Sequence, residues 1–172
     1  MDARDAFLDA FERVRDFFHE EVEGLDEDKL LFRADSKANS IAWLAWHLTR
    51  VQDDHVSEVA HADQAWVTGG WSQSFNLPLD VWDTGYGHKT QQVGDVRATA
   101  DMLVGYHDDV YKRTRRYLNG LTPDAFDTIV DRRFDPPVTL GVRLLSVVCD
   151  DLQHLGQIGF VKGLAQRRTD RG

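Results

Sequence analysis

Residues 140–164 read LGVRLLSVVCDDLQHLGQIGFVKGL, and this stretch decides the fold. Its apolar residues recur every three or four positions, which predicts a helix over this range. Because residues four apart lie on the same face of a helix, the Asp150 carboxylate and the His154 imidazole point the same way. Burying a charged group without a partner is costly, so a further group should satisfy this pair. The pair lies within an otherwise apolar row: Val147, Asp150, His154, Ile158 and Val161.

Earlier segments carry the same helical period and predict three more helices, over about residues 3–23, 40–60 and 95–119. Ser40 or the preceding Asn39 suits the start of the second of these helices, because both are good N-cap residues. The prolines in residues 135–137 interrupt any helix there, and a short extended piece is expected in the segment between Phe126 and Asp135. The tail, residues 167–172, is expected to fray.

Residues 61–94 lose the helical period between the second and third helices. Glycines are interleaved there with aromatic residues, and a short helix is expected only near residues 63–67. The large number of aromatic residues argues against disorder in this segment. The long loop is therefore expected to pack over another part of the molecule. Its length also means that a simple up-and-down topology is not assured.

Four helices of this length predict an all-α fold, namely a four-helix bundle formed by residues 1–172 as a single domain. A long aromatic-rich loop would join its second and third helices. The links between the first and second helices and between the third and fourth are shorter.

The composition of the chain limits the classes of partner and the cellular location that can be expected. The net charge of −9 argues against nucleic acid, whose binding depends on neutralising phosphates with Lys and Arg. The basic run at residues 112–116 falls near the end of a predicted helix, where cations oppose the helix dipole. No apolar stretch approaches the ~18 residues of a transmembrane helix, and the first residues lack the pattern of a secretory signal. With Cys149 as the one cysteine, an intramolecular disulfide is excluded and a cytoplasmic protein is expected.

A third candidate ligand for the pair on the last helix is His47. If it meets Asp150 and His154 across the bundle, the three form a two-histidine, one-carboxylate site for a divalent metal such as Zn²⁺ or Ni²⁺. Asp151 is the weaker carboxylate, because it projects about 100° away from Asp150. Two plainer interpretations stay open: the pair on the last helix only supports that helix, and His47 only bonds a backbone carbonyl.

Three further residues are candidates for contacts around this site. Gln157, three residues after His154, is expected to orient a ligand, or else is an ordinary surface glutamine. Trp43, one turn before His47, could wall the site, or else belongs to the core. His88 lies in the aromatic loop and could contact a substrate.

The remaining histidines and the cysteine are not expected to serve as ligands. His55 is interpreted as a core histidine, and His107 could face the bundle centre. His19 and His61 are expected at the surface. Cys149 has no basic residue placed to lower its thiol pKa and is interpreted as a small buried hydrophobic residue.

Two motifs resemble a known family. Residues 39–47, NSIAWLAWH, resemble the second-helix signature of the DinB/YfiT-like superfamily, and residues 154–158, HLGQI, resemble its last helix. The family's metal triad typically takes one histidine from the second helix and a His-x-x-x-His pair from the last. His47 and His154 match histidines of that triad, and Asp150 stands in place of the first histidine of the pair. Relatives similar to mycothiol-dependent maleylpyruvate isomerase carry Glu-x-x-x-His there, and Asp is one methylene shorter.

The resemblance covers nearly the whole chain and implies a four-helix bundle that is often a homodimer. It implies a metal-dependent S-transferase or isomerase that joins a low-molecular-weight thiol, such as mycothiol or bacillithiol, to the chemistry of a small electrophile. The alternative is a non-catalytic member of the superfamily that binds a metal structurally, or acts through a partner.

Overall fold

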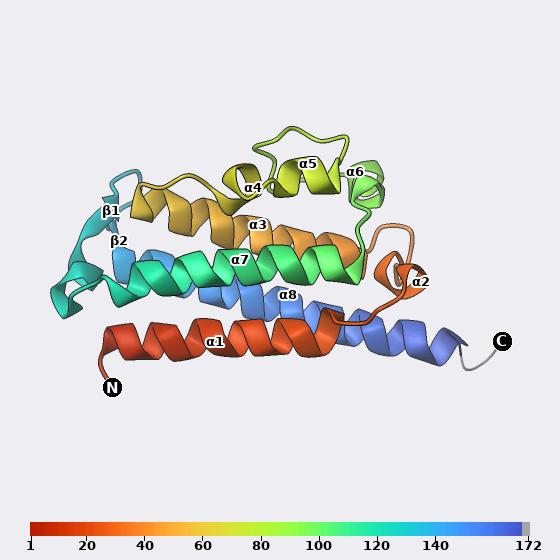
Figure 1. The fold of residues 1–172 in the computed structure, drawn as a ribbon, viewed down its shortest axis with the longest axis horizontal. Coiled ribbons are helices and arrows are strands. Elements are labelled where there is room, and N and C mark those ends of the chain that lie inside the picture. Colours follow the sequence, from red (N-terminus) through yellow and green to blue (C-terminus); the bar gives the residue numbers. More distant parts are fainter. Residues whose placement is uncertain (170–172) are drawn as a thin grey trace.

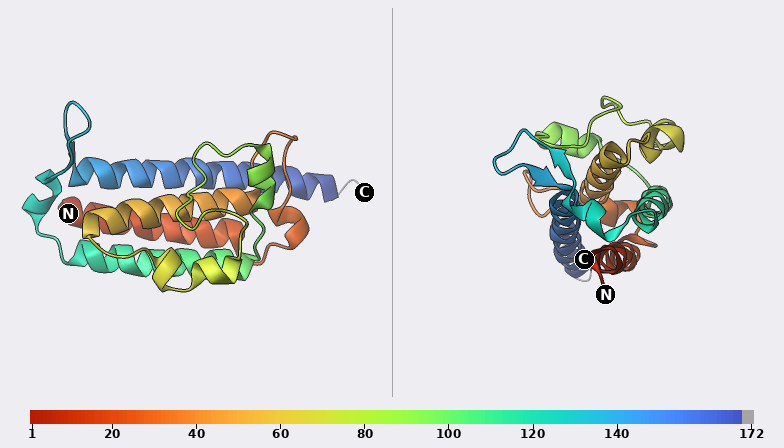
Figure 2. Two further views of the ribbon diagram at one scale, coloured as in Figure 1. Left: turned by 90° about the horizontal axis from the view of Figure 1, so that it is seen from above. Right: turned by 90° about the vertical axis from the view of Figure 1, so that its left-hand side faces the viewer.

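Four long helices pack side by side in the computed structural model, which describes residues 1–169 (Figure 1). They are α1 (Ala3–Val22), α3 (Ile41–Ala60), α7 (Ala100–Asn119) and α8 (Leu140–Thr169). Helix α3 packs on α7 and α8, and α1 packs on the same two helices, so α1 and α3 lie diagonally opposite (Figure 2). The predicted all-α four-helix bundle is therefore confirmed.

The direction of the helices explains the long loop. Helices α1 and α8 run one way and α3 and α7 run the other way (Figure 1). Because α3 and α7 are parallel, the chain must return along the length of the bundle between them. The returning segment contains α4 (Ala65–Thr68), α5 (Trp71–Phe75) and α6 (Thr90–Asp95), where the sequence predicts little more than one short helix.

Two helix boundaries differ from the prediction. The third long helix begins at Ala100 rather than near Asp95, because the Thr99 side chain accepts a hydrogen bond from the Met102 amide (3.3 Å) and caps the helix there. Helix α8 continues to Thr169, so residues 167–169 are helical where fraying is expected. Residues 170–172 of that tail lie outside the described part. The start of α3 is as expected, since the Ser40 hydroxyl accepts from the Trp43 amide (3.1 Å).

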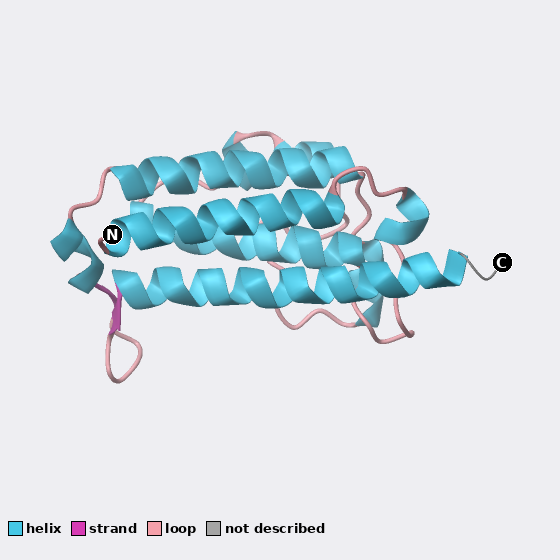
Figure 3. Ribbon diagram, turned by 90° about the horizontal axis from the view of Figure 1, so that it is seen from below, coloured by secondary structure: helices cyan, strands magenta, loops and turns pink. Residues whose placement is uncertain are grey.

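Smaller elements close the two ends of the bundle. Helix α2 (Glu27–Leu30) joins α1 to α3. The turn η1 (Pro123–Asp127) and an antiparallel hairpin of β1 (Ile129–Asp131) and β2 (Val138–Thr139) join α7 to α8, and Figure 3 shows this hairpin in magenta. The extended piece expected between Phe126 and Asp135 is thus present as β1. Within residues 1–169 no helix is both long and apolar enough to span a membrane.

The aromatic segment between α3 and α7 packs as expected. Trp66, Trp71 and Phe75 each place a ring 5.1–5.9 Å from the ring of Tyr106 on α7. Such aromatic pairs add about 0.5–1.5 kcal/mol each beyond the area that they bury. The segment thereby forms a second apolar layer over α3 and α7 instead of a mobile loop.

A buried ionic network fixes that layer to α3. Arg50 is fully buried, and its guanidinium lies 3.6 Å from the Asp53 carboxylate. Asp53 also accepts hydrogen bonds from the Tyr106 hydroxyl (2.8 Å) and from the amides of Ala65 and Trp66 (2.9 and 2.8 Å). Removing one partner of such a buried pair typically costs about 3–5 kcal/mol, so this network holds the start of α4 firmly.

Two ionisable residues lie in the core without hydrogen-bond partners among the described residues. His107 faces the bundle centre, as its sequence position allows, and stacks on Phe18 with ring centroids 4.1 Å apart. Burial lowers the pKa of His107 to about 3 and raises that of Asp151. Burial therefore disfavours the charged form of each side chain.

Cys149 does not match its expectation. The sequence analysis interprets it as buried, but its side chain is exposed. It lies on the exposed face of α8, next in sequence to the buried residues Val147 and Val148.

Replacing His107 with Phe should make the protein less sensitive to acid. The unfolded chain takes up a proton on His107 below pH ~6.5, whereas the folded chain does not until about pH 3, so acid favours unfolding. Between pH 7 and pH 4 this residue should remove about 3 kcal/mol from the free energy of unfolding. Urea unfolding of both proteins at the two pH values checks this: parallel losses in wild type and His107→Phe would contradict it.

Candidate metal centre

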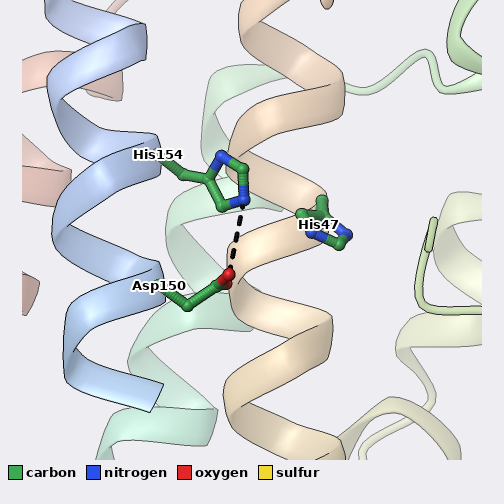
Figure 4. A group of neighbouring side chains, drawn as sticks. All are labelled: His47, Asp150 and His154. Atoms are coloured by element: carbon green, nitrogen blue, oxygen red, sulfur yellow. Dashed lines mark ion pairs between the residues drawn. The ribbon is translucent and has the colours of Figure 1, made fainter. Parts of the chain in front are cut away.

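His47 of α3 meets Asp150 and His154 of α8 between these two helices (Figure 4). One ligand atom from each residue lies within 4.8 Å of the other two. The His154 Nε2 is 3.6 Å from the Asp150 Oδ1, and the two imidazole rings are nearly perpendicular, with centroids 4.9 Å apart. The structure thus brings together the three residues that the sequence analysis selects from two distant segments.

The antiparallel packing of α3 on α8 produces this meeting. Asp150 and His154 are one turn apart on α8 and project toward α3 (Figure 4). His47 is 6% exposed, whereas the side chains of Asp150 and His154 are 35% and 16% exposed. The site therefore has a buried side at α3 and an open side along α8.

The two ring nitrogens of His47 differ in their hydrogen bonding. Nδ1 donates a hydrogen bond to the carbonyl oxygen of Thr84 (2.5 Å), which leaves Nε2 with a free lone pair. Burial lowers the pKa of His47 and keeps the ring neutral. The carbonyl bond, one of the plainer interpretations of His47, therefore exists, and it leaves the other nitrogen available as a candidate ligand atom.

His154 is arranged in the same way. Its Nδ1 lies 2.9 Å from the Oε1 of Gln157, and an N–H donated to that oxygen leaves Nε2 directed at Asp150. Metal-binding histidines commonly use one nitrogen for the metal and donate the other N–H to an oxygen. Gln157 is thus in contact with a candidate ligand.

Asp150 supplies the test of whether a cation fits. Its Oδ2 is buried and has no hydrogen-bond partner within the described chain. A buried carboxylate oxygen without a donor is costly unless a positive group faces it. One nitrogen from each of the two imidazoles and this oxygen form a donor set that Zn²⁺, Ni²⁺ and related divalent ions accept. The residues present therefore fit a divalent metal.

Trp43 forms a wall of the site. Its indole stacks on the His47 ring at 4.6 Å between centroids and meets the His154 ring edge-on at 6.4 Å. The indole N–H donates to Nδ1 of His88 (3.0 Å). Trp43 is 6% exposed, so it belongs both to the core and to the lining of the site.

His88 supports the loop that holds His47. Its Nδ1 accepts from Trp43, and its Nε2 lies 2.9 Å from the Asp83 carboxylate. Asp83 in turn accepts from the Gly85 amide (2.7 Å). Because both ring nitrogens are engaged and the side chain is 3% exposed, His88 has no free nitrogen to offer a substrate in this arrangement.

Thr84 and Gly85 contact the candidate site, and the sequence analysis does not select them. Thr84 acts through its backbone carbonyl, for which any residue type would serve. Gly85 has a φ of +92°, and a Cβ there would lie 2.9 Å from the His47 Nδ1. The one sequence signal is a glycine in a loop without periodicity, and such a signal does not point to His47.

The other histidines lie away from the three. His55 accepts a hydrogen bond from Arg143 (3.1 Å), which also binds Asp131 (2.9 Å) and so fastens the hairpin to the bundle. His19 lies 3.0 Å from the Asp108 carboxylate on α7.

The sequence profile of the DinB superfamily matches residues 10–158. The chain belongs to the DinB superfamily. A solved structure described as a conserved protein from Enterococcus faecalis resembles this DinB-superfamily chain with a TM-score of 0.87 and 25% sequence identity. The likeness covers 96% of this chain and 98% of that one. No protein of curated function matches the chain.

Substituting Gly85 should cost more stability than substituting Gly87. Both glycines have positive φ (+92° and +77°), so alanine at either position should cost about 1–2 kcal/mol of backbone strain. A Cβ at Gly87 meets nothing within 4 Å, whereas one at Gly85 meets His47 at 2.9 Å, with Trp43 and Trp46 at 3.0 Å. Urea unfolding should therefore show a larger loss for Gly85→Ala than for Gly87→Ala. Equal losses would mean that Gly85 does not press on His47.

Proposed function

We propose that this chain is a divalent-metal-dependent enzyme whose ion is bound by His47, Asp150 and His154. The observation that carries the proposal is the buried Oδ2 of Asp150, which has no hydrogen-bond partner in residues 1–169, beside two imidazoles whose Nδ1 atoms are already engaged. Three protein ligands leave further coordination positions open, which is typical of catalytic rather than structural metal sites. The partial exposure of Asp150 and His154 gives a ligand access to those positions.

The proposed reaction is an S-transfer or an isomerisation that uses a low-molecular-weight thiol of the mycothiol or bacillithiol type. Membership of the DinB superfamily supports this class. A divalent cation held at the site would favour the thiolate form of a bound thiol at neutral pH. In a transfer, the thiol loses its proton, its sulfur forms a bond to an electrophilic carbon, and the leaving group departs with the bonding electron pair.

The protein's own contribution is to hold and shield the centre. Thr84 and Gln157 keep the two imidazoles in one tautomer and orientation, so little rearrangement is needed when a cation binds. The Trp43 indole covers the buried side and excludes water from it. Where water is excluded, the lower local dielectric constant strengthens electrostatic interactions at the centre.

The proposal also includes a homodimer and a cytoplasmic location. Low-molecular-weight thiols are kept reduced inside cells, and the exposed thiol of Cys149 suits the same reducing environment. The proposed partners are the thiol and a small electrophile.

Calorimetry with metal-stripped protein tests the metal centre. One equivalent of Zn²⁺ or Ni²⁺ should bind, and His47→Ala should weaken binding by more than the roughly 10–100-fold that outer partners contribute. His61→Asn is the matched control, because it removes an exposed imidazole at a left-handed position (φ +51°) that asparagine tolerates. Equal affinity in His47→Ala and wild type would rule out the proposed centre. Thiol consumption with a model electrophile then tests the reaction class.

Gln157→Leu should lower metal affinity by roughly 10–100-fold, because the His154 Nδ1 loses the oxygen that orients it. Gln153→Leu is the control, since it makes the same change one turn earlier on α8, where the side chain instead contacts the Cys149 carbonyl. Calorimetry should show wild-type affinity for Gln153→Leu. A similar loss in both variants would indicate a general effect on α8 and not a role for Gln157 in orienting His154.

A further inference from the structure

The outward face of α8 is apolar over most of its length. Its exposed residues include three with large side chains left more than half exposed: Val142 (55%), Leu145 (55%) and Phe160 (66%). With others at the same helical spacing they form one row, the α8 stripe, which consists of Val142, Leu145, Cys149, Leu152, Gly156 and Phe160. The steps of three and four residues are those of a helix seam that packs against another helix.

The α8 stripe is also uncharged. Between Val142 and Phe160 the other exposed residues of α8 are serine and glutamine, although 28% of the whole chain is charged. The exposed positions of α1 show the usual pattern instead, with Glu12, Arg13 and Asp16 among them. A continuous exposed apolar row of this kind marks an interaction surface.

The absence of charge favours a second copy of this chain as the partner. In a two-fold symmetric interface each copy presents the same surface, so charges of one sign near the axis meet their own kind. The chain carries a net charge of −9, and most of its surface would therefore repel a second copy. The α8 stripe is a face on which two copies can meet without that repulsion.

The surface shape of the α8 stripe favours an antiparallel arrangement of the two α8 helices. The first half carries the projecting side chains of Val142 and Leu145. The second half borders a groove between α8 and residues 34–39, lined by the apolar residues Ala34, Ala38, Leu44, Gly156, Phe160 and Val161 and by the polar residues Lys37, Asn39, Gln153 and Gln157. Gly156 itself places no side chain on this part of the face. A two-fold axis near Leu152 would set Val142 and Leu145 of each copy over the groove beside Gly156 of the other.

We propose that two copies of this chain pair through their α8 stripes, antiparallel, about a two-fold axis near Leu152. This proposal rests on the homodimer of the proposed function and identifies the surface through which the two copies meet. Gln157 is exposed beside the stripe and contacts His154, so the second copy would line one side of the metal centre. The pairing itself needs no metal, and it can therefore fail or hold independently of the metal proposal.

Sedimentation of the full chain in the presence of a chelator tests the surface. The wild type should be a dimer, and Leu145→Glu and Phe160→Glu should each weaken association at least about 100-fold, because each places two carboxylates in the apolar contact. Both positions are exposed in one copy, and circular dichroism should show that the variants keep their helical content. Tyr86→Glu is the control, since it changes an aromatic residue that is 93% exposed elsewhere, and it should stay dimeric.

Cross-linking tests the orientation. In a Cys149→Ser background, Leu152→Cys should form a disulfide with its own counterpart on oxidation with diamide, because a residue at a two-fold axis lies beside itself. Val142→Cys in the same background should not, since antiparallel helices carry it away from its counterpart. A monomeric wild type, or glutamate variants that remain dimeric, would overturn the proposed surface. A Val142→Cys disulfide would overturn the antiparallel arrangement.

Discussion

The hydrogen bond from the His47 Nδ1 to the Thr84 carbonyl is the interaction on which the candidate centre depends. It fixes the tautomer of a neutral imidazole and leaves the lone pair of Nε2 free for a cation. The carbonyl is itself held by its neighbours: Gly85 adopts a backbone conformation open to few other residues, and the carbonyl of Asp83 accepts from the buried Arg50. The orientation of the His47 ring on α3 is thus set by residues 83–85, which lie in the segment between α3 and α7.

The parallel run of α3 and α7 gives that segment its place. A return across the whole bundle requires a long connection, which would ordinarily be a mobile surface loop. Here the aromatic layer on Tyr106 and the Asp53 network fasten the connection to α3 and α7. The same residues that pack the crossover therefore also position the loop that carries Thr84. The packing of the crossover and the geometry of the candidate site depend on the same residues.

The bundle and the pairing of Asp150 with His154 could be predicted from sequence, because both follow from helical periodicity. The N-cap at Ser40 likewise marked the start of α3 correctly. The boundary near Asp95 was misplaced, since α6 and α7 together continue a helical pattern that Thr99 interrupts. The roles of Thr84 and Gly85 could not be predicted, because a carbonyl and a missing Cβ leave no side-chain pattern. Cys149 was misassigned because apolar character alone does not distinguish a core row from an exposed one.

The candidate ligands come from two helices that lie far apart in the sequence. Because synthesis runs from the N-terminus, His47 on α3 is made well before Asp150 and His154 on α8. A nascent chain therefore carries the His47 imidazole without its two neighbours until α8 has been made and has docked on α3. Loading with a cation would then follow folding rather than guide it, and an ion would have to enter from the more exposed side of the site along α8.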